Sequence, residues 1–388
     1  MNTASPLYLT HAHIVLAEQE LHDASLLIGA DGRIAAINPE SGGGAPELSL
    51  NGQWLLPGMV DLHCDAVEKE VEPRARVLFP LDFACINIDR RNAAAGITTP
   101  YHALSFAHAE WGVRNNETAT ELVRALRRLK AHELIDNRVH VRYEITDLSA
   151  LPHVLGLLDE GGVDLLSIMD HTPGQGQFKH LDSYVAYMMG NHGSSQQAAL
   201  QMAEEKMQAR QSADERVLAV MERAKQRGVP TASHDDDDPQ RVLTMKSLGA
   251  RMSEFPINLD TARAAHAAGL ATILGAPNVM RGGSQSGNMR ALDAIHAGVA
   301  DCLCADYAPA TMLAAVDALV HREGLGLPQA TRLVSLGPAR AAGLNDRGEI
   351  AVGLRADLIS VARPGGQAAV ERVWCAGKPV FAVDYQGR

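Results

Sequence analysis

Cysteines are few in this sequence, and their spacing offers no framework of disulfide bonds. The five cysteines, Cys64, Cys85, Cys302, Cys304 and Cys375, are odd in number and form no Cys-x-x-Cys pair. This usage favours a reducing compartment, so we expect a cytoplasmic protein. No stretch approaches the about 20 apolar residues of a membrane span, and the N-terminus lacks the basic-then-apolar pattern of a secretion signal.

Aromatic residues and positive charge are also scarce. Phe, Trp and Tyr make up 4% of the chain, which leaves no platform on which nucleic-acid bases could stack. The formal net charge of −11 argues against nonspecific binding to nucleic acid. It does not exclude a small anionic substrate, because metal ions and a few arginines create a local positive pocket in an acidic protein. We therefore expect a small-molecule substrate, and neither nucleic acid nor a membrane as partner.

Fingerprints of nucleotide-binding folds and of nucleophilic hydrolases are missing as well. The chain contains no Gly-x-Gly-x-x-Gly, no Gly-x-x-x-x-Gly-Lys-[Ser/Thr] and no Gly-x-Ser-x-Gly. No cysteine stands out beside a histidine and asparagine pair. Catalysis by a side-chain nucleophile is therefore disfavoured.

The centre of the chain alternates apolar strand candidates with helical patterns, which is typical of βα units with a parallel sheet. The predicted strands cover 56–63, 97–104, 138–144, 164–171, 229–234, 251–255, 271–276 and 301–306. The predicted helices cover 81–95, 116–133, 147–160, 197–227, 239–248, 259–268, 287–297 and 309–323. This pattern predicts a (β/α)8 TIM barrel of about 250 residues. The alternative is a doubly wound open sheet, which requires a reversal in strand order.

Both ends of the chain consist of short strand candidates separated by turns. Strands are predicted at 7–15, 23–28 and 34–37, and the segments 348–361 and 370–376 repeat this pattern. We therefore expect an α/β protein with two domains. Residues 1–56 and 346–388 together form a small β-sandwich domain, and residues 57–345 form the barrel.

His63 and Asp65 close the first predicted barrel strand and give the first sign of a metal site. Side chains two residues apart on a strand point to one face, and an imidazole beside a carboxylate suits zinc or manganese. Ionisable residues also lie at the ends of other predicted strands: Arg142, Glu144, Asp170, His171, His234, Asp235, Glu254 and Asp306. Because barrel strands end at one rim, their convergence predicts a site for one or two divalent ions. Metal ions lower the pKa of a bound water, and Asp306 is predicted to be a ligand that also acts as general base.

These motifs resemble the amidohydrolase superfamily, which combines His-x-Asp on the first strand, histidines on middle strands, an aspartate on the eighth strand and a flanking β domain. Longer stretches resemble one family within it, the diphosphatases of the carbon–phosphorus lyase pathway. They are Leu62–Lys69, Met169–Gln175, Ala232–Asp236, Ser253–Pro256, Gly275–Asn288 and Cys304–Ala310. The similarity extends from about residue 50 to residue 345.

The resemblance implies hydrolysis of a phosphoanhydride of α-D-ribose 1-methylphosphonate 5-triphosphate, with release of diphosphate. It implies metal-ligand roles for His63, Asp65, His234 and Asp306. Glu144 and His171 are further candidate ligands, and one of them is a candidate to bridge two ions. Glu254 is a candidate ligand or substrate contact. Superfamily barrels are often dimers or larger, so we expect a homo-oligomer.

A triphosphate requires cationic and amide donors, and three segments offer them. Arg281, Gly282, Gly283 and Ser284 combine a guanidinium with flexible backbone amides. Lys69 and Arg74 follow the first barrel strand. Lys179 lies in the Gly-rich insertion 172–195, which is predicted to be either a mobile lid or a disordered loop.

Two other functions stay open at this point. A superfamily member with the same metals could hydrolyse a cyclic amide or deaminate a heterocycle, and it would yield a ring-opened product or ammonia instead of diphosphate. A non-catalytic scaffold could retain the fold, and it would show neither a bound divalent ion nor activity when one is added.

Overall fold

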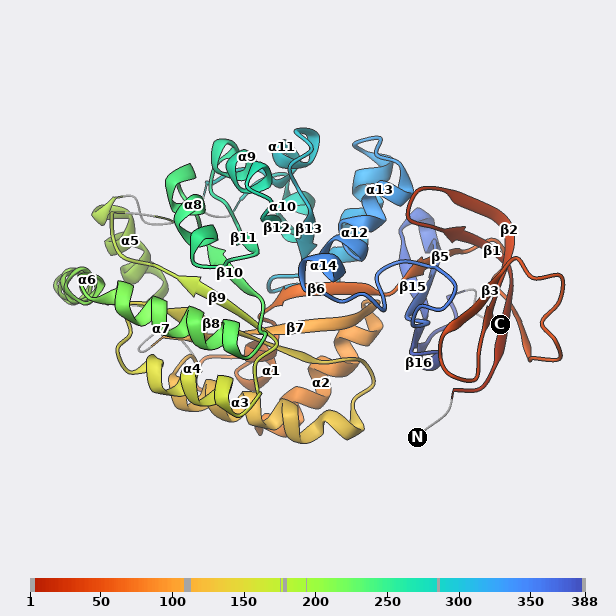
Figure 1. Cartoon of the computed structure of the whole chain (residues 1–388), viewed down its shortest axis with the longest axis horizontal. Coiled ribbons are helices and arrows are strands. Elements are labelled where there is room, and N and C mark those ends of the chain that lie inside the picture. The colour runs from red at the N-terminus through yellow and green to blue at the C-terminus, as the bar shows by residue number, and fades with distance from the viewer. Residues whose placement is uncertain are drawn as a thin grey trace.

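The computed structural model describes residues 4–107, 113–174, 176, 180–192, 194–284 and 287–385. A barrel of parallel strands and helices occupies one end of the elongated molecule, and a sheet built from both chain ends occupies the other (Figure 1). No helix in these ranges is both long and apolar enough to cross a membrane.

The barrel contains eight parallel strands whose spatial order follows the chain from β6 to β13. They are β6 Met59–Cys64, β7 Ile97–Phe106, β8 Arg138–Glu144, β9 Leu165–Met169, β10 Thr231–His234, β11 Met252–Glu254, β12 Ala271–Gly275 and β13 Cys302–Cys304. Each strand overlaps a predicted one, so the predicted barrel is confirmed. The open-sheet alternative is wrong, because the order contains no reversal.

The barrel closes through the backbone that carries two candidate site residues. The amide of Asp306 donates to the carbonyl of His63 at 2.8 Å, and the amide of Asp65 donates to the carbonyl of Asp306 at 3.1 Å. Cys64 and Asp306 thereby form a parallel bridge between the first and last strands. The contact that closes the barrel thus also places Asp65 beside Asp306.

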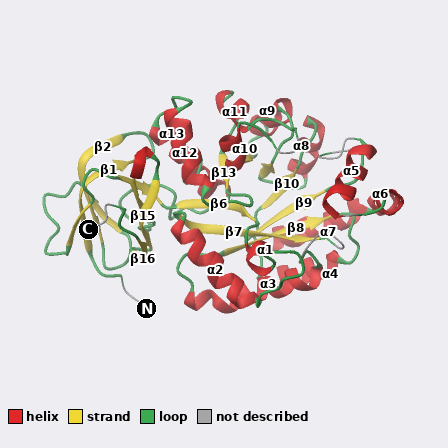
Figure 2. Cartoon of the chain, turned by 180° about the vertical axis from the view of Figure 1, so that it is seen from behind, coloured by secondary structure: helices red, strands yellow, loops and turns green. Residues whose placement is uncertain are grey.

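Helices surround these strands on the outside (Figure 2). They are α1 Val67–Val71, α2 Leu81–Ala94, α3 Asn116–Leu129, α4 Ala150–Asp159, α5 Leu181–His192, α6 Gln196–Arg210, α7 Ala213–Gln226, α8 Pro239–Ser247, α9 Leu259–Ala267, α10 Ala276–Arg281, α11 Ala291–His296, α12 Thr311–His321, α13 Leu327–Arg332 and α14 Leu336–Ala341, with 3-10 turns at Lys130–His132 and Pro364–Gly366. Asn115, Asn258 and Asp238 cap α3, α9 and α8 through side-chain acceptors.

Three helical predictions need correction. The single helix expected over 197–227 is two helices, because Ser212 has a non-helical backbone between α6 and α7. The helix expected over 287–297 begins only at Ala291. Part of the insertion 172–195, expected as a lid or loop, forms helix α5, whose Tyr184 and Met188 pack in one apolar cluster with Ala199 and Ala203 of α6.

Strands from both chain ends form one mixed sheet in the order β16-β15-β14-β5-β1-β2-β3, with β4 paired to β1. They are β1 Leu7–Val15, β2 Glu20–Ile28, β3 Ile34–Ile37, β4 Glu47–Ser49, β5 Trp54–Pro57, β14 Leu358–Ala362, β15 Ala369–Cys375 and β16 Lys378–Ala382. The two ends approach closely at Gly32, where a Cβ atom would lie 2.3 Å from the carbonyl oxygen of Ala376. Both termini thus build one sheet separate from the barrel, as the predicted fold class requires, and the domain boundaries stay a prediction.

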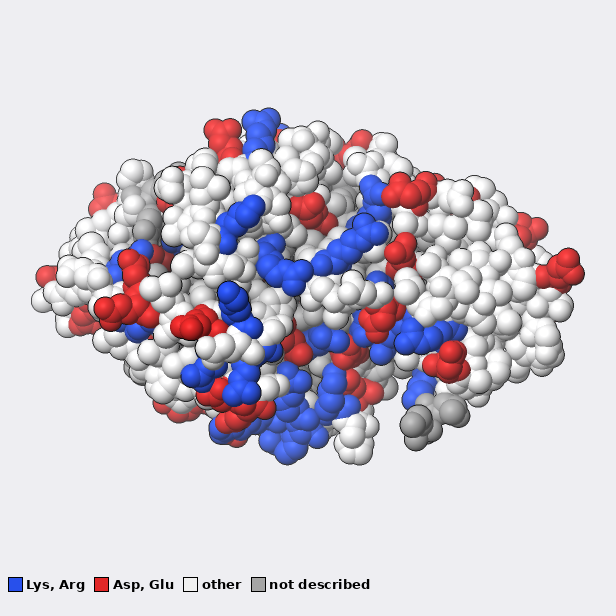
Figure 3. Space-filling view, viewed as in Figure 1, with Lys and Arg blue, Asp and Glu red and all other residues white. Residues whose placement is uncertain are grey.

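The surface of the molecule mixes both signs of charge. On the face shown in Figure 3, basic side chains gather over the middle and lower part with acidic ones beside several of them, and much of the rest is uncharged. Exposed ion pairs of this kind join helices, as Arg124 of α3 does with Glu160 at 2.8 Å. Such exposed pairs contribute little to stability.

A buried arginine joins the terminal sheet to the barrel. The guanidinium of Arg347 is 2.7 Å from the carboxylate of Asp136 and 2.9 Å from the hydroxyl of Thr99. Asp357, next to β14, lies 3.9 Å away. Burial alone would raise the pKa of Asp136, but the charges of Arg138, Lys130 and Arg347 outweigh it and hold that pKa below its usual range.

We predict that Arg347→Ala destabilises the protein by about 1–3 kcal/mol, because it removes hydrogen bonds to Asp136 and Thr99 while Lys130 and Arg138 still pair with Asp136. Thermal unfolding followed by circular dichroism measures the effect as a fall in Tm. Arg124→Ala, which breaks an exposed pair instead, is the matched control and should leave Tm nearly unchanged. Equal Tm values for both variants would contradict the role of Arg347.

Candidate metal centre

Histidine and carboxylate side chains from separate barrel strands meet at the C-terminal rim. Three overlapping groups have potential ligand atoms within 4.8 Å of one another: His63, Asp65 and Asp306; His63, His234 and Glu254; and His171, His234 and Asp235. His63 is common to the first two groups, and His234 is common to the last two. The groups therefore form one continuous cluster. One lobe of it consists of His63, Asp65 and Asp306 at β6 and β13, and the other consists of His171, His234 and Asp235 at β9 and β10.

Glu254 orients two imidazoles of this cluster. Its Oε1 is 2.7 Å from Nδ1 of His63, and its Oε2 is 2.8 Å from Nδ1 of His234. The two rings stack with centroids 5.9 Å apart. Burial alone would raise the pKa of Glu254, but the neighbouring imidazoles hold it well below its usual range. Because Nδ1 is engaged in both rings, Nε2 is the nitrogen that each presents as a ligand.

Glu144 acts on His171 in the same manner. Its Oε2 is 2.9 Å from Nδ1 of His171, while its Oε1 accepts from the amide and the hydroxyl of Thr146. Lys206 of α6 lies 3.8 Å from the same carboxylate. Nε2 of His171 is 3.8 Å from Asp235. Glu144 thus lies behind His171 and belongs to none of the three groups found among the described residues.

Asp65 and Asp306 place two carboxylates close together. The pKa of Asp306 is raised to about 6, first by burial and second by the negative charge of Asp65. Arg114 balances Asp65 only in part, at 3.3 Å, since its Nε also binds Glu68 at 2.7 Å. A divalent cation would relieve the repulsion between the carboxylates of Asp65 and Asp306. The Nε2 atoms of the nearby imidazoles would supply its remaining ligands. The donor set fits zinc or manganese.

Three residues at strand ends have a left-handed backbone, which turns their side chains toward the mouth of the barrel. Asp235, Phe255 and Asp306 have φ of 54°, 55° and 54°. Aspartate tolerates this conformation, whereas it is rare for phenylalanine. The amide of Phe255 donates to the carbonyl of Ile273, and its ring contacts those of His63 and His234, with centroids 5.0 and 5.4 Å away. Phe255 therefore holds both imidazoles from the side.

The predicted phosphate contacts lie outside this cluster. Lys69 and Arg74 are exposed, on α1 and on the loop after it. Arg281 is exposed at the end of α10, and the amides of Gly282 and Gly283 donate to carbonyls of that helix, followed by half-buried Ser284. These two amides are therefore not open to a ligand in this conformation. Lys179 falls outside the described residues.

Sequence reasoning did not assign several residues of the centre. Phe255 was not singled out, because a left-handed φ leaves no pattern in the sequence. Arg114 precedes α3 and shows no informative spacing. Arg142, which shares a face of β8 with Glu144, was expected at the rim from the sequence, but no role was assigned to it.

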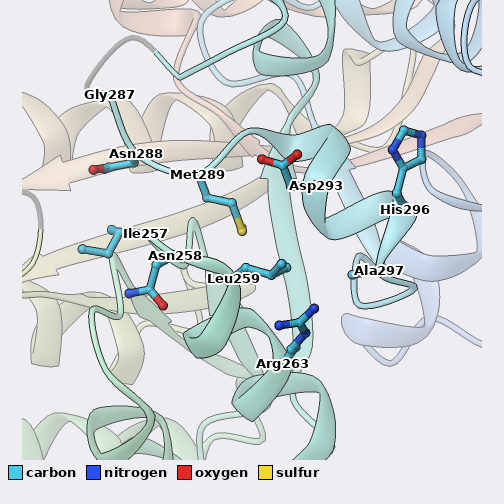
Figure 4. A pocket seen from close by; sticks show the side chains of 10 residues that line it. All are labelled: Ile257, Asn258, Leu259, Arg263, Gly287, Asn288, Met289, Asp293, His296 and Ala297. Atoms are coloured by element: carbon cyan, nitrogen blue, oxygen red, sulfur yellow. The ribbon is translucent and has the colours of Figure 1, made fainter.

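A separate pocket lies between α9 and α11 (Figure 4). It is lined by Ile257, Asn258, Leu259, Arg263, Gly287, Asn288, Met289, Asp293, His296 and Ala297. None of these residues belongs to the candidate metal centre.

Comparisons with known proteins agree with this arrangement. A model of the amidohydrolase family matches residues 116–380. The α-D-ribose 1-methylphosphonate 5-triphosphate diphosphatase of Escherichia coli K12 is 34% identical over 383 residues, which cover 97% of this chain and all of the relative. Among solved structures, a putative prolidase from Bifidobacterium longum superposes with a TM-score of 0.65 at 17% identity over 99% of this chain and 97% of that one. N-acetyl-D-glucosamine-6-phosphate deacetylase from Mycobacterium smegmatis gives 0.64 at 17% identity over 97% and 100%. These two likenesses concern the fold alone.

We predict that Glu254→Gln weakens divalent-metal binding by about 10–100-fold, because an amide can accept a hydrogen bond from only one of the two imidazoles. Competition with a chelating dye measures the affinity. Glu160→Gln removes an exposed carboxylate and should change nothing. If Glu254→Gln keeps the wild-type metal affinity, Glu254 does not orient the ligands.

Proposed function

We propose, from the premise that this chain belongs to the amidohydrolase family, that it hydrolyses a phosphoanhydride of α-D-ribose 1-methylphosphonate 5-triphosphate and releases diphosphate. Membership of this family, together with the similarity to a named diphosphatase, identifies the chain as a hydrolase. The substrate is proposed from one observation above all, the 34% identity to the Escherichia coli diphosphatase along nearly the whole chain. The reaction class also fits a site that combines metal-ligating residues with buried and half-buried cations.

His63, Asp65 and Asp306 would hold one divalent ion, and His171, His234 and Asp235 would hold a second. Zinc or manganese suits both donor sets. When bound, such an ion supplies Lewis acidity, which activates water and polarises a phosphoryl oxygen. Glu254 and Glu144 keep the three imidazoles in the tautomer that leaves Nε2 available.

Asp306 is suited to accept the proton of the attacking water. Its carboxyl group is half-buried, and its pKa, raised to about 6 by burial and by Asp65, lies close to neutral pH. A carboxylate with that pKa is deprotonated at pH 7 and is a stronger base than an exposed aspartate. The left-handed backbone at Asp306 directs the side chain to the rim.

The proposal also includes the predicted phosphate contacts, the cellular location and the assembly of the protein. Lys69, Arg74, Lys179 and the segment Arg281–Ser284 are proposed contacts for the distal phosphates, which would require Arg281 to turn toward the substrate. A cytoplasmic location and a homo-oligomeric assembly also stay predictions.

Product analysis tests the proposed reaction. The metal-loaded protein should release diphosphate from a ribose 5-triphosphate, and it should leave dihydrouracil and cytosine unchanged. Ring opening or ammonia release without diphosphate would support the amide-hydrolysing or deaminating alternative and contradict the phosphoanhydride.

Asp306→Asn should lower kcat for diphosphate release by about 10²–10⁴-fold while most of the bound metal is retained, because the amide cannot accept the proton. Steady-state kinetics and metal analysis of the same preparation measure both quantities. Asp293→Asn, which changes a half-buried aspartate on α11 outside the candidate centre, is the control. Turnover that matches the wild type would remove Asp306 from the base role.

A further inference from the structure

Arg142 is a buried cation that has no counter-ion among the described residues. It lies on β8 and is 7% exposed. Its Nη2 is 3.4 Å from Nε2 of His234, and its Nε has no hydrogen-bond partner. Within the described ranges, no carboxylate forms an ion pair with it. A buried guanidinium that lacks an anion is costly, so its presence calls for an explanation.

Arg347, which is also buried, illustrates a structural role, because its guanidinium is fully paired within the chain. Arg347 is 6% exposed, and its guanidinium is paired with Asp136 and Asp346 and bonded to Thr99. Arg142 has no comparable set of partners. Its free donors are therefore available to a group that the chain itself does not supply.

The neighbours of Arg142 on the strand fix where it points. His140 and Glu144 share its face of β8, one on each side along the strand. His140 bonds to the carbonyl of Leu62 at 2.9 Å and to the hydroxyl of Ser167, and Glu144 is engaged by His171 and Thr146. Arg142 is thus directed toward the middle of the barrel mouth.

Arg142 lies against the candidate centre itself. Its Nη2 is 3.4 Å from Nε2 of His234, and His234 belongs to two of the three groups of potential ligands. The guanidinium of Arg142 and a metal ion at the candidate centre would repel each other. An anion bound between them would remove this repulsion.

We propose that Arg142 binds a non-bridging oxygen of the phosphoryl group under attack and so determines the preference for a phosphoanhydride over an amide. This inference rests on the function proposed above. A phosphoryl group brings anionic oxygens to the reacting centre, whereas a neutral amide brings none. A guanidinium can hold such oxygens with two parallel hydrogen bonds.

The reaction balances with Arg142 as a binding group only. The water oxygen bonds to the attacked phosphorus, and the bond from that phosphorus to the bridging oxygen breaks. Diphosphate leaves with the electron pair, and Asp306 takes the proton of the water. Arg142 keeps its proton throughout and stabilises charge on the non-bridging oxygens, as arginines do in other phosphoryl transfers.

Arg142→Ala, Arg142→Lys and Arg127→Ala test the proposal in the full-length, metal-loaded protein. Arg127 pairs with Asp164 on the outside of the barrel and is the matched control. We expect Arg142→Ala to lower kcat for diphosphate release by about 10³-fold, and guanidinium chloride at non-denaturing concentration to restore at least part of it. Arg142→Lys should recover little, because an ammonium lacks the planar fork.

Binding measurements separate this role from a structural one. Calorimetry should show at least tenfold weaker binding of ribose 5-phosphate, which carries the phosphoryl group under attack, to Arg142→Ala. Metal affinity should equal or exceed that of the wild type, since a positive charge is removed. Weaker metal binding with unchanged ribose 5-phosphate affinity would mean that Arg142 only supports the fold.

The two proposals fail in distinguishable ways. A wild-type protein that releases no diphosphate from triphosphates contradicts the proposed function. Wild-type and Arg142→Ala proteins that bind ribose 5-phosphate equally contradict the role of Arg142, whatever the reaction is.

Discussion

The carboxylate of Glu254 is the interaction on which the rest of the site depends. It binds Nδ1 of His63 on β6 and Nδ1 of His234 on β10, so one group fixes side chains from two distant parts of the chain. The geometry is available only because the barrel closes and brings β6 near β11. The closing backbone bonds between His63, Asp65 and Asp306 belong to the same rim. The contacts that close the barrel therefore also assemble the candidate centre.

Three left-handed residues and an unpaired buried cation lie at this rim. Asp235, Phe255 and Asp306 have left-handed backbones at or just beyond the ends of their strands, and Arg142 is buried without an ion-pair partner among the described residues. Such features cost stability and persist only where the surrounding structure enforces them. By contrast, Arg347 at the junction of the two domains has its partners in place. The two buried arginines thus differ: Arg347 is paired within the described chain and Arg142 is not.

Much of the architecture could be predicted from the sequence, because it depends on local periodicity. The eight barrel strands follow from apolar runs, and the position of His63 and Asp65 on one face follows from the period of two. Helix α10 was missed, because six residues are too few to show a helical period, and its cap engages the amides of Gly282 and Gly283 that were expected to face a phosphate. Glu144 was expected as a ligand, and its place behind His171 depends on side-chain geometry that no spacing records. Phe255 and Arg142 owe their roles to contacts between distant strands.

Anomalous X-ray scattering from crystals loaded with zinc or manganese tests the central claim, that the Glu-oriented imidazoles present Nε2 to a divalent ion. The account predicts a peak within about 2.0–2.3 Å of Nε2 of His63 or His234, with Glu254 still bound to both Nδ1 atoms. A peak bound through Nδ1, or the absence of any peak at this rim in crystals that contain the metal, would contradict it.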